Sequence, residues 1–414
     1  MPEIPMCVLR RLGALCLLCA WTAASALAQS AAPAGQIPAQ SAAPAQPAAA
    51  AQPSPPAPDM VADYTQYHQG LAALDDLQWG KALAAFQAMS ASSAQAEGAL
   101  YWKAFALYRA GKGTDAAAPL AELRKSFPNS GWLHDAGALG SVIAANPQSV
   151  DGGKEQSAAV RQQALEDRMN ADAAHAPALL REAVLDIGLP GFRQKALYFL
   201  SKQASKESRD IVLQVAHGAA NPDLQAYAIS QLGKTDSQAV FDLYPAVDAG
   251  MKALVLSVLA ANRESARLLR IAGEEKDDDL RYEALSNLVD VGTDAQVTQA
   301  LAGEKAEDVK MLIQAKLNNV HNWVAAHLND LQHGKDSLDR RMGAVGLMRG
   351  GEPSTDRALV AAYSSEKDEE VKGAIIFALG ERRNYAALQN MDKTETNAGL
   401  KLRIEIALQG TQAK

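Results

Sequence analysis

The stretch EKDDDLRYEALSNL, residues 275–288, decides the fold because the chain repeats it. Two further stretches, EKAEDVKMLIQAKL (304–317) and EKDEEVKGAIIFAL (366–379), align with it without a gap, and a weaker copy, KDSLDRRMGAVGL, occupies 335–347. Each copy opens with acidic or polar residues and continues with apolar residues at the spacing of an amphipathic helix. Repetition at this period indicates an array of stacked helical units.

A pair of residues defines the common register of these copies: a basic or polar residue, followed seven positions later by a leucine. Successive leucines are separated by 27–32 residues, and a second segment with helical periodicity lies between them, as at 209–219, 265–274 and 294–304. Eight pairs share this register: Arg193/Leu200, Gln225/Leu232, Lys252/Leu259, Arg281/Leu288, Lys310/Leu317, Arg340/Leu347, Lys372/Leu379 and Lys401/Leu408. Two helices in every ~30 residues predict an all-α fold, an α-solenoid of helical hairpins.

Turn residues mark the expected ends of these helices. Three glycines sit just past helical segments, where a left-handed C-terminal cap is favoured: Gly233, Gly292 and Gly380. Three carboxylates stand where a helix begins and its first N–H groups need acceptors: Asp223, Asp278 and Glu369.

The acidic turn, the [LV]-[RK] pair and the A-x-x-x-L-G pattern, clearest in EEVKGAIIFALG (369–380), resemble HEAT-like repeats of the short, bilin-lyase type. The resemblance covers roughly 190–409 within a predicted solenoid of 190–414. It implies a binding scaffold, since HEAT-like domains mostly serve that role.

A different repeat organises residues 60–145. Pro128 closes the second unit. Small or bulky residues recur 34 positions apart in four pairs: Gly70/Ala104, Ala82/Ala116, Phe86/Leu120 and Met89/Leu123. This pattern resembles the tetratricopeptide repeat. Because two such units cannot bury their faces alone, helices at 132–145 and 160–188 are expected to cap them or bridge them to the second solenoid, with 146–189 as the connecting region. The loop 146–156 is the expected boundary.

The N-terminus predicts export. A basic start ending in Arg10 and Arg11, an apolar run over 12–26 and the triplet Ala26-Leu27-Ala28 are typical of a signal peptide, 1–28. A retained membrane anchor is the alternative. All three cysteines of the chain fall within this segment, so the mature protein would have no disulfide and no thiolate metal site. We expect a periplasmic or secreted protein with no transmembrane helix after cleavage.

Residues 29–59 contain almost only Ala, Pro, Gln and Ser and carry no charge up to Pro58, which predicts a disordered linker. It would act either as a tether or as a plain spacer. The formal net charge of the chain is −7, which argues against nucleic acid as a partner. The row of basic residues in the repeat has two interpretations: an ion-pair ladder with the acidic turns, or a positive stripe that binds an acidic peptide or glycan.

Candidate metal ligands favour structural interpretations. The run Asp277-Asp278-Asp279 lacks the alternating ligands and the glycine of a calcium loop and is better explained as a helix-capping turn. His321, His327 and His333 follow each other at intervals of six, which turns them to different faces of a helix. We predict no metal and no cofactor, and His321 and Trp323 should serve packing or a turn.

Aromatic residues concentrate in the tetratricopeptide-like region. Phe86 and Phe105 occupy packing positions. Four others are the candidate partner-binding residues, as the wall of a groove: Tyr67, Tyr101, Trp102 and Tyr108.

No catalytic motif is complete in the sequence, so we do not expect an enzyme: G-x-S-x-G, the phosphate-binding loop, H-E-x-x-H and the dinucleotide fingerprint are all missing. The favoured function is a non-catalytic periplasmic scaffold that binds a protein or peptide partner of the cell envelope. Two alternatives stay open: a hydrolase or metal-dependent enzyme with its site between the two solenoids, and a structural protein of the cell wall.

Overall fold

The computed structural model describes residues 60–147, 156–172, 175–185, 188–348 and 351–409. The predicted signal peptide (1–28), the predicted linker (29–59) and most of the predicted boundary loop lie outside these residues.

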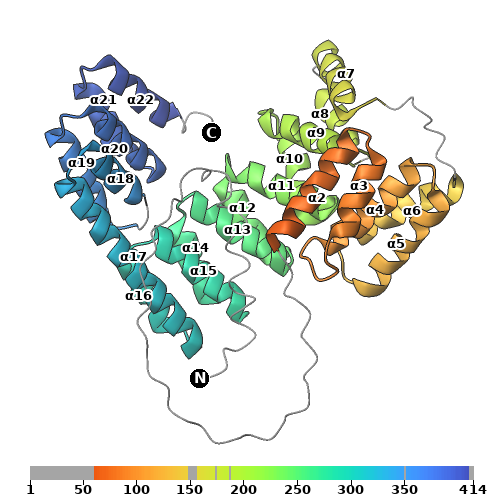
Figure 1. The fold of residues 1–414 in the computed structure, drawn as a ribbon, viewed down its shortest axis with the longest axis horizontal. Helices are drawn as coiled ribbons and strands as arrows, with labels where there is room; N and C mark the ends of the chain where they lie inside the picture. The colour runs from red at the N-terminus through yellow and green to blue at the C-terminus, as the bar shows by residue number, and fades with distance from the viewer. Residues whose placement is uncertain (1–59, 148–155, 173–174, 186–187, 349–350, 410–414) are drawn as a thin grey trace, which may run out of the picture.

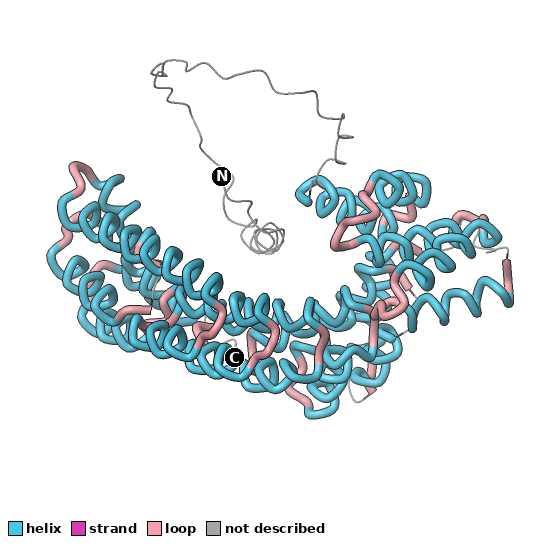
Figure 2. Tube along the Cα trace, turned by 90° about the horizontal axis from the view of Figure 1, so that it is seen from below, coloured by secondary structure: helices cyan, strands magenta, loops and turns pink. Residues whose placement is uncertain are grey.

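Helices build the whole described structure. No strand occurs over these ranges, and successive helices pack against one another. Figure 2 shows them in two layers along an open arc, and Figure 1 places the N-terminal helices (orange) and the C-terminal helices (blue) at opposite ends. The predicted all-α, solenoid-like fold is therefore confirmed. Within the described segments, no helix combines the length and the apolar character needed to cross a membrane.

The N-terminal helices share an aromatic core, and we call them the head. Trp102 and Phe105 are almost fully buried in it. Gly70 lies so close to Phe86 that a Cβ at this position would come within 2.4 Å of the ring, so the first hairpin needs a glycine here. The head comprises α2 (Met60–Asp75), α3 (Trp79–Ala88), α4 (Ala96–Arg109), α5 (Gly113–Ser126) and α6 (Leu133–Ala145).

Two connecting helices, α7 (Ala158–Ala171) and α8 (Ala176–Leu185), lead into the repeated units. We call the helix that carries the basic–leucine pair the first helix of a unit, and the helix after it the second helix. The first helices here are α9 (Pro190–Lys202), α11 (Pro222–Gly233), α13 (Ala249–Ala261) and α15 (Asp278–Val291). The second helices are α10 with its continuation η2 (Lys206–Gln214, Val215–Ala219), α12 with η3 (Ser237–Leu243, Tyr244–Ala246), α14 (Ser265–Glu274) and α16 (Asp294–Gly303).

Helix α17 (Glu307–His333) departs from the two-helix unit, because it runs for 27 residues where the other units turn. Its sequence contains neither glycine nor proline, so no local signal interrupts the helix. Val324 of α17 packs against two separate hydrophobic cores. The unit after the break and those that follow comprise α18 (Ser337–Gly346), α19 (Pro353–Ser365), α20 (Glu369–Glu381), α21 (Tyr385–Thr394) and α22 (Ala398–Gln409).

The repeated pair has the same structural meaning throughout. Each of the eight pairs lies on one first helix, and Leu347 directly follows the end of its helix. Seven of the eight leucines are buried, and Leu408 is partly buried. The leucine therefore anchors each unit in the core, while the basic residue stands at the start of the helix.

The predicted left-handed glycine caps are wrong. Among the described glycines, only Gly111 and Gly218 have positive φ. Gly233 serves close packing instead, because a Cβ there would lie 2.2 Å from Val258 Cγ1. The left-handed positions after α13 and α20 are held by Arg263 and Arg383, each with φ of 56°.

The carboxylates predicted to cap helix N-termini lie one or two residues after the residues that cap these helices. At two of the three positions the preceding residue does the capping: Asp277 accepts the N–H groups of Asp279 and Leu280, and Asp368 caps α20 in the same way. Asn221 caps α11, which leaves Asp223 free for a different contact described below.

Candidate functional site

The basic residues of the repeat form a ladder of ion pairs along one edge of the solenoid. In four units the basic residue contacts a glutamate in the turn before the next first helix, and we call each such contact a rung. One oxygen of that glutamate also accepts two backbone N–H groups of its own turn. The rungs are Lys252–Glu275, Arg281–Glu304, Arg340–Glu366 and Lys372–Glu395. The ladder interpretation of the basic row is thus the one that the structure supports.

Lysine rungs include a tyrosine. Tyr244 Oη donates to Glu275 Oε2 at 2.8 Å, and Lys252 Nζ donates to the same oxygen at 2.9 Å. The ammonium also lies 4.9 Å from the centre of the Tyr244 ring, within cation–π range. Tyr363, Lys372 and Glu395 repeat the arrangement, with 4.8 Å between Lys372 Nζ and the ring centre.

Within the described residues, the arginine rungs include no tyrosine. Arg281 binds Glu304 with two nitrogens, Nε to Oε2 at 3.1 Å and Nη2 to Oε1 at 3.2 Å. Arg340 binds its glutamate in the same bidentate manner. Tyr244 stands eight positions before Lys252, and the residues eight positions before the two arginines are Gly273 and Gln332. A planar guanidinium supplies two parallel donors, one to each carboxylate oxygen, whereas lysine and tyrosine both donate to a single oxygen.

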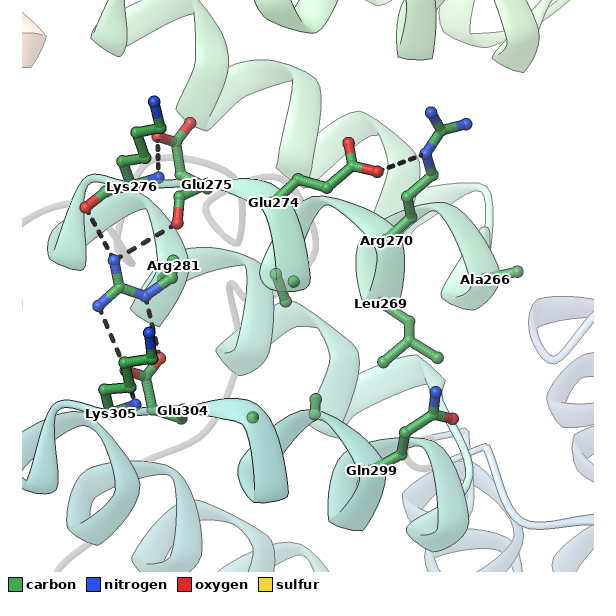
Figure 3. Close-up of a pocket in the computed structure, with 14 residues that line it drawn as sticks. Ala266, Leu269, Arg270, Glu274, Glu275, Lys276, Arg281, Gln299, Glu304 and Lys305 are labelled. Atoms are coloured by element: carbon green, nitrogen blue, oxygen red, sulfur yellow. Dashed lines mark hydrogen bonds and ion pairs between the residues drawn. The ribbon is translucent and has the colours of Figure 1, made fainter.

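A groove opens where the tyrosine is missing. In the Arg281 rung a cavity of about 780 Å³ lies between α14 and α16. Figure 3 shows Arg281 bridging the turns that follow these two helices, with Lys276 and Lys305 at the same end of the groove and Leu269 and Gln299 further along it. Five of the other lining residues are small, which keeps the groove open, and four are charged: Ala266, Ala272, Gly273, Ala300 and Gly303, and Arg270, Glu274, Glu275 and Glu304.

A second groove occupies the equivalent position in the Arg340 rung. It has a volume of about 560 Å³ and is lined by residues at the end of α17, on α19 and in the following turn. Arg340, Glu366 and Lys367 correspond in register to Arg281, Glu304 and Lys305. The grooves are therefore a product of the repeat and of the residue chosen in each rung.

The carboxylates of the rungs are suited to binding rather than to proton transfer. Burial alone would raise the pKa of Glu275, but hydrogen bonds from Lys252, Tyr244 and the turn N–H groups outweigh it and lower this pKa to about 2. The pKa of Glu304 is also lowered, because the Arg281 guanidinium and two N–H groups outweigh its burial. A carboxylate that stays ionised in this way is a weak general base at neutral pH.

Among the described residues, three members of the basic row form no rung: Arg193, Lys310 and Lys401 of the last unit. Lys310 contacts Glu307 on its own helix, because Gly334 stands where the next unit would place a glutamate. Arg193 is almost fully buried and donates to Asp135 of the head at 3.0 Å and to Val184 O at 2.9 Å.

The predicted partner-binding aromatics lie in the core of the head and not on a groove wall. Tyr67, Tyr101, Trp102 and Tyr108 have exposed fractions of 3%, 0%, 1% and 9%. Packing explains their position: Tyr101, Trp102 and Trp132 lie within 5.7 Å of one another, measured between ring centres. A partner would contact these four side chains only if the head helices separated.

Two of these aromatics join the head to the repeated units. Tyr67 Oη donates to Asp223 Oδ2 at 2.7 Å, and Trp102 Nε1 donates to the same oxygen at 3.3 Å. Burial raises the pKa of Asp223, although both donors oppose the change. Asp75 adds a contact from α2 to the N-terminus of α9, accepting the Gly191 N–H at 2.9 Å.

The other predicted sites have structural roles. Asp277 is the N-cap of α15. His321, His327 and His333 lie on the single helix α17, where His321 contacts Asp294 and the His327 ring stacks on Trp323 with 4.2 Å between ring centres. Across the described ranges, no group of three or more potential metal ligands gathers.

The groove itself was not among the predicted sites, although the sequence contains its signal. Tyrosine precedes Lys252 and Lys372 by eight or nine positions, and glycine or glutamine precedes the two arginines. A comparison of rung types would have shown where a side chain is missing.

The sequence matches no model of a known protein family and no curated protein.

Proposed function

We propose that this protein is a non-catalytic scaffold of the cell envelope that holds a segment of a protein or peptide partner in the grooves beside its arginine rungs. The single observation that carries the proposal is recurrence: two grooves lie at equivalent positions in the repeat, each between successive second helices and each ending at a bidentate Arg–Glu pair. Equivalent grooves on one edge of a solenoid suit an extended segment.

The composition of the first groove supports a peptide ligand. Its interior offers apolar contacts from Leu269 and Ala300, and its ends offer charged groups of both signs. Lys276 and Lys305 are exposed. Clefts of a few hundred Å³ with apolar walls and a few fixed polar groups are typical ligand sites.

The sequence features supply the wider context of the proposal. The eight repeated pairs resemble HEAT-like units, and the 34-residue spacing in the head resembles tetratricopeptide repeats. The basic, apolar and small-residue pattern over 1–28 favours export. Together these features favour a periplasmic or secreted binding protein over an enzyme.

Site-specific photo-crosslinking in living cells tests the proposal. A photoreactive amino acid replaces Gln299, which lines the first groove, in the full-length protein. The matched control is Asn390, five positions before Glu395 as Gln299 is before Glu304, in a rung that Tyr363 completes. We expect a discrete crosslinked partner from position 299 and none from position 390.

Filling the groove provides the second arm of the experiment. Gly273→Tyr places a ring where Tyr244 lies in the neighbouring rung, and a Cβ at Gly273 would meet no atom within 4 Å. The variant should unfold at a midpoint no lower than that of the parent and lose the crosslink from position 299. An unchanged crosslink in Gly273→Tyr, or the same partner from position 390, would refute binding in the groove.

A further inference from the structure

The lysine rungs show which side chain fits the position that a tyrosine occupies there and that no tyrosine of the described residues occupies in an arginine rung. Two of its four rungs are completed by a tyrosine, Tyr244 or Tyr363, placed at the end of a second helix. The first groove lies at the corresponding end of α14 and is lined there by Ala272 and Gly273. The lysine rungs are thus an internal reference for the chemistry that the groove can accept.

The hydrogen bonds that the rung glutamates accept also indicate that a tyrosine hydroxyl fits in the arginine rung. Oε2 of Glu275 accepts two side-chain donors, Tyr244 Oη and Lys252 Nζ. Within the described residues, Oε2 of Glu304 accepts one, Arg281 Nε. A carboxylate oxygen can take two donors, so Glu304 retains an acceptor position that corresponds to the one filled by the tyrosine hydroxyl.

The cation of the rung favours an aromatic ring. Lysine ammonium groups already lie 4.9 Å and 4.8 Å from the ring centres of Tyr244 and Tyr363. A guanidinium stacks on aromatic faces at least as well as an ammonium. The side chain of Arg281 is 15% exposed and that of Glu304 is 2% exposed, so an entering ring contacts the guanidinium first and its hydroxyl reaches the carboxylate beyond.

We propose that the groove between α14 and α16 binds a tyrosine side chain of the partner segment, with the ring on the Arg281 guanidinium and the hydroxyl directed at Glu304. This inference rests on the proposed function, since it names the anchoring residue of the segment bound there. The cavity of about 780 Å³ accommodates more than one aromatic side chain, so residues next to the tyrosine fit as well.

Titration of the full chain with N-acetyltyrosinamide tests the inference. In protein labelled with ¹⁵N-glycine, the amides of Gly273 and Gly303 report on the groove. We expect saturable shifts of both signals. N-acetylphenylalaninamide should bind about tenfold more weakly, because it lacks the hydrogen bond to a charged acceptor, and N-acetylleucinamide should give no saturable shift.

Variants of Gly273 provide the control. Gly273→Ala leaves the groove open and should bind N-acetyltyrosinamide as the parent does, whereas Gly273→Tyr fills the groove and should not bind it. Equal affinity for the tyrosine and leucine compounds, or binding that survives Gly273→Tyr, overturns the inference.

The two proposals fail in different ways. A partner crosslinked from position 299 through a segment without tyrosine overturns the inference and leaves the scaffold function supported. Saturable binding of N-acetyltyrosinamide without any crosslinked partner supports the inference and counts against the scaffold function.

Discussion

Lysine and arginine are not interchangeable within a rung, because each requires a different neighbour. Lys252 shares its glutamate with Tyr244, whereas Arg281 binds Glu304 through two nitrogens and has Gly273 beside it. A lysine in place of Arg281 would bind Glu304 through a single nitrogen and would find no tyrosine to supply a second donor group.

We therefore predict that Arg281→Lys lowers the free energy of unfolding by about 1.5–3 kcal/mol, the value of a hydrogen bond to a charged group. The double variant Arg281→Lys/Gly273→Tyr converts the rung to the lysine–tyrosine type and should recover most of the loss. Urea unfolding followed by circular dichroism measures both. If the tyrosine stabilises the parent and the lysine variant equally, the two positions are not coupled and the rung model is wrong.

Asp75 gives the junction between the head and α9 a defined pH dependence. Burial raises its pKa from 3.8 to about 6, although the Gly191 N–H opposes this and the charge of Asp76 adds to it. Because the folded pKa lies above the unfolded one, the folded state holds the proton more tightly. This contribution to stability is complete below pH 4 and is lost as the pH rises through about 6.

The variant Asp75→Asn cannot ionise and should not show this loss. We predict that it matches the parent near pH 4 and exceeds it by about 1–2 kcal/mol at pH 7.5, after allowance for the partial exposure of the carboxyl group. Unfolding in urea at a series of pH values measures the difference. A constant difference across the series would show that the Asp75 carboxyl titrates normally in the folded protein.

The sequence predicts the residues of the ladder better than the residues of the head. Arg281 and Glu304 belong to aligned repeats, so their register alone places them on neighbouring units. Tyr67 and Trp102 carry no such register. The residue type alone does not show whether an aromatic side chain is buried or exposed. In the head, only the packing of α2, α4 and α6 decides this.

Among the helices, α17 shows how an element can replace a turn. Its first half packs on α15 as a first helix, and its second half forms a hairpin with α18 as a second helix. The repeat pattern predicts a first helix and a second helix in this region, but it does not predict that they form one continuous helix. Their continuity depends on the lack of a helix-breaking residue between them.

We predict that Ala325→Pro separates the two cores that α17 connects. Proline in the interior of a helix costs about 3 kcal/mol or more, since it removes a hydrogen bond and clashes with the preceding turn. Ala325 is exposed, so the loss would come from the backbone alone. Urea unfolding should change from one transition to two. Ala325→Gly is the matched control, and it should cost about 1 kcal/mol and leave a single transition. One transition in the proline variant would mean that the cores are coupled by other contacts.

At the scale of the whole molecule, the head is fixed to the repeated units by buried polar contacts. Asp135 of α6 accepts Arg193 Nη1 and Asn221 Nδ2, each at 3.0 Å, and the Asp135 and Arg193 side chains are 7% and 2% exposed. Residues separated by 58 to 156 positions meet here. No periodic pattern relates the two repeat types, so this junction could not be predicted from the sequence.

We predict that Asp135→Ala destabilises the protein by about 3–5 kcal/mol, because it leaves the Arg193 charge buried without a partner. The head should then detach, which small-angle scattering would detect as a larger radius of gyration under conditions where circular dichroism still shows folded helices. Asp167→Ala, at an exposed position on α7, is the control and should change neither quantity. An unchanged radius in a destabilised Asp135→Ala protein would show that apolar packing alone fixes the head.

The two forms of rung also bear on how such a protein can evolve. Between the two rung types of this chain, a tyrosine is replaced by glycine or glutamine and a lysine by an arginine, and neither replacement changes the leucine that anchors the unit in the core. New specificities can therefore arise one unit at a time on an unchanged backbone, with the number and spacing of binding positions inherited as a pattern of rungs.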